Sequence, residues 1–347
     1  MGRRTAATSA ASLVLAALVC VPGQAPATVP PAEPARVMLV GDSSTQGSTG
    51  DWTWRYRLWQ HLDATAPGQV DLVGPHDDLW DQSSRTYGHQ TYADPAFDRD
   101  HAARWGLSLA FPERPIAQYV ADYQVDAVVE LLGIDDLVFL GHDPAHVRAD
   151  VERLVAHARS VNPEVAVVLG ELIQTWLPGA TDLNAQLREV AADLDEAGSR
   201  VVVAETADGF FRRRDTYDNS HPNARGEVKI AAAVADALAV TGIGAPAARP
   251  LPAVPVGPRI PVVLHGEVRD GRVKLRWTSS PGADGYRVLV RRPATSKTWR
   301  KLGDTTRRRV TVRGLTPGER VQIVVLPRKG KDLAELDVRS NRLSLRP

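Results

Sequence analysis

The sequence predicts an α/β domain built on a parallel sheet, followed by a small all-β sandwich. In the longer first part of the chain, short Val-rich runs alternate with stretches of helical periodicity, a pattern typical of a parallel sheet covered by helices on both faces. In the last ~85 residues, short alternating segments are separated by Pro and Gly turns, which is typical of a small all-β sandwich. These two patterns predict two folded domains.

The elements of the first domain follow from the spacing of apolar residues. Apolar runs predict five strands: Val37–Val40, Val70–Val73, Ala127–Leu132, Val165–Leu169 and Val201–Ala204. Helical spacing predicts five helices: Thr53–Ala64, Pro115–Tyr123, Ala145–Ser160, Asp182–Ala197 and Asn223–Ala239. The connection from Gly74 to Pro112 interrupts this order, because it is long, polar and rich in Asp, Tyr, Trp and His. Long irregular connections are usually functional or mobile, so we expect this one to cover the active site.

The second domain is predicted over residues 261–347, after a Pro/Ala-rich linker at 245–260. Its predicted strands are Val273–Trp277, Gly285–Val290, Arg309–Val312 and Glu319–Val325. Together with Trp277 before a turn, Gly285-Tyr286-Arg287-Val288 and the turn Gly314-Leu315-Thr316-Pro317-Gly318, they resemble a fibronectin type III domain. The resemblance implies an immunoglobulin-like sandwich. One departure is Val321, which stands where that family often has a tyrosine.

The amino terminus has the composition of a targeting segment. Arg3 and Arg4 precede an apolar run that ends near Val21, and Ala25-Pro26-Ala27 follows, which is the order of a secretory signal. The apolar run is too short to span a membrane. We therefore predict a signal peptide at 1–27, a spacer at 28–35, and a secreted, extracellular protein without a transmembrane segment. Cys20 is the only cysteine and would be removed, which excludes disulfides and thiol catalysis.

Charge is distributed unevenly along the chain. The formal net charge is +1, but residues from Pro261 onward carry 21 Lys and Arg and 8 Asp and Glu, a net +13, which leaves −12 for the rest. Such basic runs are usually solvated surface, although they would also bind an anionic cell-wall polymer or acidic polysaccharide. Export and the scarcity of interleaved aromatic residues argue against nucleic acid.

Two short motifs carry the parts of a serine nucleophile. Gly41-Asp42-Ser43 directly follows the first predicted strand, and Asp218 stands three residues before His221 near the end of the same domain. The carboxyl ends of parallel strands are where α/β sheets place their chemistry. A hydroxyl, an imidazole and a carboxylate together form an activated serine. The nine histidines show no close pair in a helical or strand ligand motif, so we expect no metal.

With Gly133-Ile134-Asp135-Asp136 after the third predicted main strand, these motifs resemble the spaced blocks of SGNH/GDSL-type hydrolases, over residues 36–244. The resemblance implies a flavodoxin-like three-layer fold and esterase chemistry without a cofactor. It also implies that Ser43 is the nucleophile, that His221 accepts and returns its proton, and that Asp218 orients the imidazole.

The same resemblance implies an oxyanion hole made by the backbone N–H groups of Ser43 and a glycine and by a third side chain. For the glycine we predict Gly106, with Gly88 as the alternative. The third residue, Asp135, stands where the family has asparagine, and an ionised carboxylate offers no donor. Three outcomes are open: Asp135 is held protonated, another donor replaces it, or the enzyme is slow or silent.

The substrate prediction rests on aromatic residues near the expected sheet edge. We predict that Trp80, Trp105 and Trp176 bind substrate, because aromatic faces among polar groups suit a sugar ring. The sequence therefore favours a serine esterase that removes short acyl groups, most simply acetyl, from carbohydrate. One alternative is a lipolytic esterase, although residues 74–112 contain no long apolar flap. Another is a catalytically weak glycan- or cell-wall-binding protein on the same fold, for which Asp135 argues.

Overall fold

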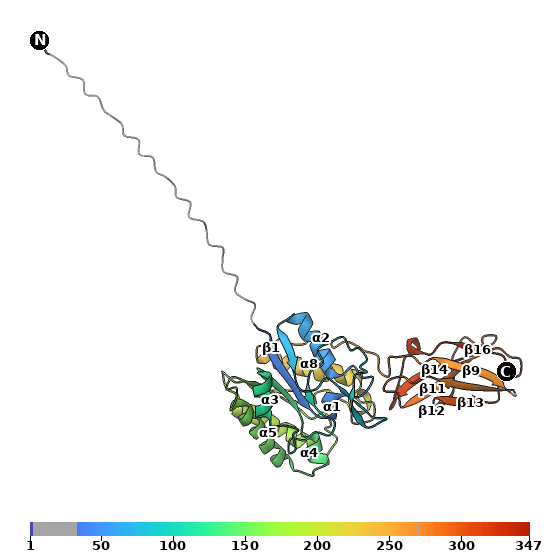
Figure 1. Ribbon diagram of the computed structural model, residues 1–347, viewed down its shortest axis with the longest axis horizontal. Coiled ribbons are helices and arrows are strands. Elements are labelled where there is room, and N and C mark those ends of the chain that lie inside the picture. Colours follow the sequence, from blue (N-terminus) through green and yellow to red (C-terminus); the bar gives the residue numbers. More distant parts are fainter. Residues whose placement is uncertain (3–32, 270) are drawn as a thin grey trace. The chain divides into compact units, whose positions relative to one another are not determined.

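The first domain is built on a parallel sheet (Figure 1). In this computed structural model, which describes residues 1–2, 33–269 and 271–347, the strand order is β2-β1-β6-β7-β8. The strands are β1 (Ala35–Gly41), β2 (Val70–Val73), β6 (Ala127–Leu131), β7 (Ala166–Gly170) and β8 (Val201–Ala204). A two-residue strand, β5 (Ala102–Ala103), pairs in parallel with the end of β1. This is the flavodoxin-like order, so the predicted fold class is confirmed.

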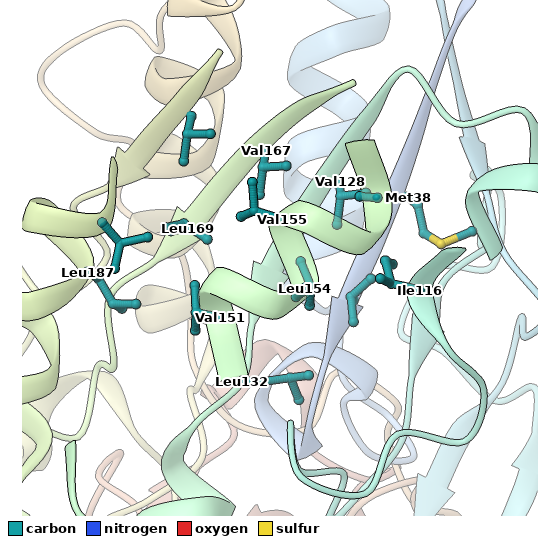
Figure 2. Close-up of a cluster of buried hydrophobic side chains, with 14 of the residues drawn as sticks. Met38, Ile116, Val128, Leu132, Val151, Leu154, Val155, Val167, Leu169 and Leu187 are labelled. Carbon is teal, nitrogen blue, oxygen red and sulfur yellow. The ribbon is translucent and has the colours of Figure 1, made fainter. Parts of the chain in front are cut away.

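Helices cover both faces of this sheet because side chains of successive strand residues point to opposite sides. On one face, Met38 and Val128 pack with α3 (Ile116–Tyr123), α5 (Pro144–Arg159) and α6 (Ala180–Leu194), as Figure 2 shows around Leu154. On the other face, Val37 and Leu39 pack with α2 (Trp54–Thr65) and α8 (Ala224–Val240). Each of these helices therefore packs its apolar face against one side of the sheet.

The order of the strands determines where the site lies. β1 and β6 are neighbours in register from Val37–Ala127 to Gly41–Leu131. The order reverses between these two strands, and ligands of open α/β sheets bind at such a switch point. Short helices begin just beyond both strands, α1 (Ser43–Gln46) and α4 (Ile134–Val138). The segments that follow β1 and β6 therefore open onto the same edge.

The remaining elements of this domain are short. The connection from Gly74 to Pro112 contains β5 and a two-stranded antiparallel ribbon made of β3 (Leu79–Asp81) and β4 (Thr86–His89). A four-residue helix, α7 (Arg212–Asp215), precedes the segment that carries Asp218 and His221. No helix within the described residues is both long and apolar enough to cross a membrane. The predicted signal peptide lies almost wholly outside the described residues.

Residues 261–347, called here the C-terminal module, form an antiparallel sandwich. One sheet has the order β13-β10-β9 and the other β12-β11-β14-β15, with β16 beside β14. Trp277 and Tyr286 pack between the sheets. Pro34–Pro347 is one compact unit. The strands are β9 (Leu264–Arg269), β10 (Arg272–Trp277), β11 (Gly285–Arg291), β12 (Arg300–Thr305), β13 (Arg309–Val312), β14 (Val321–Lys329), β15 (Asp332–Leu333) and β16 (Leu343–Leu345), with a 3₁₀ turn at Leu336–Val338.

Candidate active site

Ser43 lies at the first position of α1, immediately after β1. The turn into this helix is tight, because a Cβ atom at Gly41 would overlap the Thr45 side chain. Asp42 caps the helix by accepting the Ser44 N–H at 2.7 Å. A four-residue helix has little stability of its own, so the cap and the strand behind it fix the direction of the Ser43 hydroxyl.

The structure brings Ser43, His221 and Asp218 into one hydrogen-bonded series. His221 Nε2 lies 3.1 Å from Ser43 Oγ, and His221 Nδ1 lies 2.7 Å from Asp218 Oδ2. The other Asp218 oxygen, Oδ1, accepts the backbone N–H groups of Ser220 at 3.0 Å and His221 at 2.8 Å. Partial burial favours the neutral acid, but the hydrogen bonds and charge of His221 and these N–H groups lower the pKa of Asp218 to about 2. Asp218 is therefore ionised at neutral pH.

Asp135 is the second residue of α4, just beyond the end of β6. Its side chain is only 7% exposed, and its Oδ2 atom has no hydrogen-bond partner among the described residues. Burial and the negative charge of Asp136 raise the pKa of Asp135 to about 6, and His221 opposes that rise. The carboxyl is thus neutral, and able to donate a hydrogen bond, in mildly acidic solution.

Two further buried carboxyl groups lie under this edge of the sheet. Burial, together with the neighbouring charge of Asp135, raises the pKa of Asp42. Burial also raises the pKa of Glu130 to about 8, with smaller contributions from Asp136 and Asp42, although its Oε1 accepts the Leu132 N–H. Sequence reasoning did not single out Glu130, because it stands within an otherwise apolar strand.

The segment 104–110 carries the predicted oxyanion glycine. Gly106 has a left-handed φ of +84°, and no hydrogen bond from its N–H is found among the described residues. The Gly88 N–H, in contrast, is donated to Asp78 Oδ2 at 2.5 Å. Gly106 is therefore the better candidate of the two. Asp136 holds the far end of this segment by accepting the N–H groups of Leu109 and Ala110 at 2.9 and 3.0 Å.

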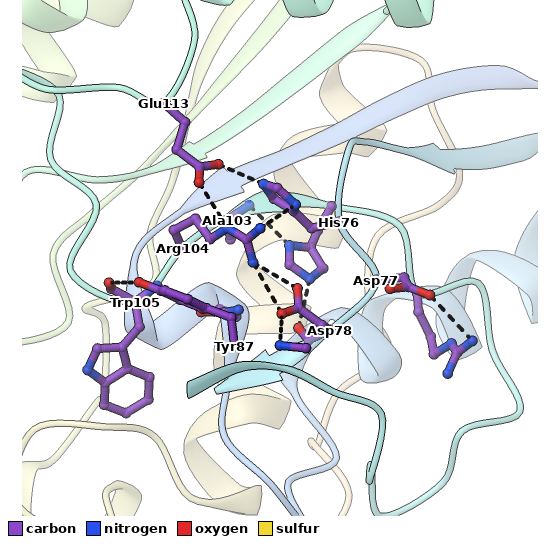
Figure 3. A network of polar contacts seen from close by, with 12 residues as sticks. His76, Asp77, Asp78, Tyr87, Ala103, Arg104, Trp105 and Glu113 are labelled. Carbon is purple, nitrogen blue, oxygen red and sulfur yellow. Dashed lines mark hydrogen bonds and ion pairs between the residues drawn. The ribbon is translucent and has the colours of Figure 1, made fainter. Parts of the chain in front are cut away.

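A polar network anchors the same segment from outside (Figure 3). The Arg104 guanidinium donates to Asp78 Oδ1 at 3.0 Å, to Glu113 Oε1 at 3.0 Å and to His76 Nδ1 at 2.8 Å. The Tyr87 hydroxyl donates to the Trp105 carbonyl at 2.9 Å. On the inner side, the Trp105 N–H donates to Gln46 Oε1 on α1 at 2.8 Å. This network was not predicted, because its members are separated in sequence and belong to no motif.

Aromatic rings line the edge beside His221. The Trp105 ring stacks on the His221 imidazole with centroids 4.4 Å apart, and Trp80 stacks on Trp105 at 5.9 Å. Tyr87 meets Trp80 edge-on. Trp176 packs against the core on the α8 side of the sheet, with the Arg212 guanidinium 5.6 Å from its ring centre. Of the three predicted substrate-binding tryptophans, Trp80 and Trp105 are thus brought together, and Trp176 is not.

The structure brings together three possible metal ligands that the sequence did not indicate. Within the described ranges, His142, His146 and Asp150 place one possible ligand atom each within 4.8 Å of one another. Their spacing was missed because His142 precedes the start of α5 at Pro144. Arg153 already pairs with Asp150, so the cluster has a protein cation at its carboxylate.

A parallel α/β sheet that ends in a linked hydroxyl, imidazole and carboxylate is the arrangement of an ester hydrolase. The comparison with protein families agrees. Residues 39–228, more than half of the chain, match the model of the GDSL-like Lipase/Acylhydrolase family. The chain belongs to this family, and it is an ester hydrolase.

Solved structures similar to the chain include esterases for its first part and fibronectin-like modules for its last. A carbohydrate esterase family 3 protein from Talaromyces cellulolyticus is 26% identical, with a TM-score of 0.50 over 58% of this chain and 94% of its own. A family 3 carbohydrate esterase from Clostridium thermocellum is 22% identical, with a TM-score of 0.49 over 60% and 97%. An Fn3-like protein from Clostridium thermocellum is 19% identical, with a TM-score of 0.21 over 24% and 85%. No curated protein matches the chain.

Proposed function

We propose that this ester hydrolase removes short acyl groups, most simply acetyl, from carbohydrate through an acyl-enzyme on Ser43. The observation that carries the proposal is the unbroken series from Ser43 Oγ through His221 to Asp218, with Trp105 stacked on the same imidazole. The imidazole that would activate the nucleophile is therefore in direct contact with an aromatic ring. The similarity to the Talaromyces cellulolyticus carbohydrate esterase supports the sugar as the alcohol part.

In the proposed mechanism, Ser43 Oγ attacks the ester carbonyl carbon while His221 Nε2 takes the hydroxyl proton. The tetrahedral intermediate then expels the sugar hydroxyl, which receives that proton from His221, and an acyl group stays on Ser43. Water repeats the sequence, with His221 as base, and releases the carboxylic acid. Asp218, ionised and fixed by two backbone N–H groups, holds the imidazole in the tautomer that can accept at Nε2.

The proposed oxyanion hole consists of the Ser43 N–H, the Gly106 N–H and the protonated carboxyl of Asp135. Among the described residues, neither the Gly106 N–H nor Asp135 Oδ2 has a hydrogen-bond partner, which supports this assignment. A neutral carboxylic acid can donate the hydrogen bond that the family's asparagine would give, whereas the carboxylate would repel the developing negative charge. Of the three outcomes left open by the sequence, we therefore propose that Asp135 is protonated and that the enzyme is active.

The substrate class is supported by the surface beside the triad. Trp80 and Trp105 stack on one another beside His221 and are both only partly buried, and partly exposed aromatic rings suit the apolar face of a pyranose ring. Gln82, directly after β3, donates to the Tyr217 hydroxyl at 2.8 Å, and this places a polar side chain beside the ring that stacks on His221. A lipolytic esterase would instead need a large apolar surface at this edge to hold an acyl chain.

The proposal is tested by hydrolysis of an aryl acetate and of acetylated xylan, next to a short-chain triglyceride. We expect turnover of the aryl acetate and xylan, and loss of activity by about 10³-fold or more in Ser43→Ala. The exposed Ser160→Ala serves as a control that keeps activity. A folded parent protein that hydrolyses none of these esters above the Ser43→Ala background would favour the glycan-binding alternative. Preference for the triglyceride would favour the lipolytic one.

We also propose that the protein is exported and that its basic module binds an anionic polysaccharide or wall polymer. The terminal pattern of Arg3, Arg4 and Ala25-Pro26-Ala27 supports export. A groove on the β13-β10-β9 sheet supports binding, because basic side chains outnumber the one acidic side chain, Glu267, in its lining; they are Lys274, Arg276, Arg307 and Arg309, together with His265. Co-sedimentation with an acidic polysaccharide should weaken as salt rises, and binding that is equal at low and high salt would contradict this electrostatic mechanism.

A further inference from the structure

We infer that the C-terminal module helps to position the catalytic residues. Its β14–β15 turn, Lys329–Asp332, holds the segment that carries Asp218 and His221. The segment 216–223, called here the histidine loop, runs from the end of α7 to the start of α8. The β14–β15 turn contacts this loop on both sides of the two reacting residues. The inference concerns positioning, so it does not depend on which ester is the substrate.

The turn grips both flanks of the histidine loop through directed hydrogen bonds. On the amino-terminal flank, the Lys331 N–H donates to the Tyr217 carbonyl at 2.9 Å, and Lys331 Nζ donates to Thr216 Oγ1 at 3.0 Å. On the carboxyl-terminal flank, Asn223 Nδ2 donates to Asp332 Oδ2 at 2.7 Å. Asn223 is also the cap of α8, two residues after His221. The loop is therefore held at its two ends by one turn.

Gly330 lets the two backbones approach closely. Its φ is +53°, in the left-handed region, and a Cβ atom there would overlap the Tyr217 carbonyl group. Both observations require glycine at position 330. Other residues are strained in the left-handed conformation, and the Tyr217 carbonyl leaves no room for a side chain. A simple tether between two domains would not need a contact of this kind beside a catalytic histidine.

Lys329 extends the contact to the segment that follows the nucleophile. Its side chain is only 9% exposed, and its ammonium group donates to Ser48 Oγ at 2.6 Å and pairs with Asp51. The same ammonium lies 4.5 Å from the centre of the Tyr217 ring, and that ring stacks on His221 at 5.7 Å. A cation that is removed from water is costly unless it is fully paired, and Lys329 has a carboxylate, a hydroxyl and an aromatic face.

The contacts therefore connect the two segments that hold the reacting atoms. Ser48 and Asp51 follow α1, which carries Ser43, while Tyr217 precedes Asp218 and His221. Proton transfer requires that Ser43 Oγ and His221 Nε2 keep hydrogen-bond distance, and small displacements of such pairs reduce rate strongly. Weakening the β14–β15 turn should thus lower kcat, while KM, set by the substrate surface, changes little.

The test uses the full chain with single glycine variants. In Gly330→Ala the new Cβ meets the Tyr217 carbonyl, whereas in Gly314→Ala the backbone is equally left-handed, with φ of +71°, but the new Cβ meets open space. Both carry the strain of a side chain at positive φ, so only the clash with the histidine loop differs. We expect kcat on an aryl acetate to fall about tenfold or more in Gly330→Ala, with KM within about twofold, and to stay near the parent value in Gly314→Ala.

A second variant tests the charged contact without leaving a buried ion unpaired. Lys329→Met combined with Asp51→Asn removes both charges, and Lys297→Met, at an exposed position between β11 and β12, is its control. The rate at which an aryl fluorophosphonate labels Ser43 is measured as well, because it reports on serine activation by His221 whatever the acyl substrate. We expect slower labelling in the double variant and in Gly330→Ala, and unchanged labelling in both controls.

The inference is overturned if Gly330→Ala and the double variant remain folded and keep the parent's kcat and labelling rate. It is also overturned if their losses disappear well below the melting temperature, since the contact would then only stabilise the fold. If Gly330→Ala does not fold, the double variant decides. An inactive parent toward acetylated xylan would contradict the proposed substrate alone, because the labelling rates still distinguish these variants.

Discussion

Asp135 sets the proposed pH dependence of the reaction. In the proposed oxyanion hole it takes the place of the family's asparagine, and it is a donor only while protonated. Burial and Asp136 raise its pKa to about 6, so the donor is present below that pH and is lost above it. The proposed activity should therefore decline as the pH rises above the pKa of Asp135.

We therefore predict that Asp135→Asn increases kcat at pH 8. Asparagine donates at every pH and removes a negative charge from the oxyanion position, and one such donor is commonly worth about 10²-fold. We expect a gain of at least about tenfold and a flatter alkaline limb in a pH–rate profile. Asp122→Asn, at an exposed position on α3, controls for the change in net charge. Loss of turnover in Asp135→Asn would contradict the assignment of the donor.

At the scale of elements, the segment 104–110 is held as one piece. Arg104 pairs with Asp78 and Glu113, its backbone N–H completes the β5 pairing by donating to the Gly41 carbonyl at 3.0 Å, and Asp136 caps the other end. Gly106 and Trp105 lie between these anchors. Their position relative to His221 therefore depends on contacts outside the reacting atoms.

From this arrangement we predict that Arg104→Gln lowers kcat/KM by about tenfold or more, because Asp78 and Glu113 lose their shared cation and the loop gains freedom. KM for acetylated xylan should rise with it, since Trp105 belongs to the same segment. The effect should be smaller for a small aryl acetate. Arg114→Gln, which removes an exposed pair with Asp122, is the matched control. Equal losses for both substrates would argue against a role in sugar binding.

The same elements show what the sequence can and cannot predict. The main strands and long helices were predicted because their apolar periodicity is local, and Asp218 and His221 because they are three residues apart. The helices α1, α4 and α7 are too short to show a period.

The choice between Gly106 and Gly88 required knowing that Asp78 accepts the Gly88 N–H, and the place of Trp176 depends on packing on the α8 side of the sheet. The Arg104 network and the contacts of Lys329 join residues far apart in sequence, so no local pattern indicates them.

At the scale of the whole molecule, buried carboxyl groups should determine how stability changes with pH. Burial raises the pKa of Glu130 to about 8, and burial with the charge of Asp51 raises that of Glu227 to about 7. In the unfolded chain both titrate near 4.3. The folded state therefore binds more protons than the unfolded state between these values, and stability must fall as pH rises across that range. Asp218 affects stability in the opposite direction. Its lowered pKa stabilises the folded state at neutral pH, and this contribution is lost as the pH falls from about 4 toward 2.

We accordingly predict that the melting temperature is higher at pH 5 than at pH 8.5, and that Glu130→Gln reduces the difference. A glutamine can still accept the Leu132 N–H through its Oε1, but it has no proton to lose, so it removes a penalty of at most about 5 kcal/mol at alkaline pH. Thermal unfolding of the parent and variant at both pH values measures this. Glu164→Gln, at an exposed position, should leave the difference unchanged. The prediction fails if the parent protein is more stable at pH 8.5 than at pH 5. It also fails if Glu130→Gln shows the same difference in melting temperature as the parent, because the raised pKa of Glu130 would then not contribute to that difference.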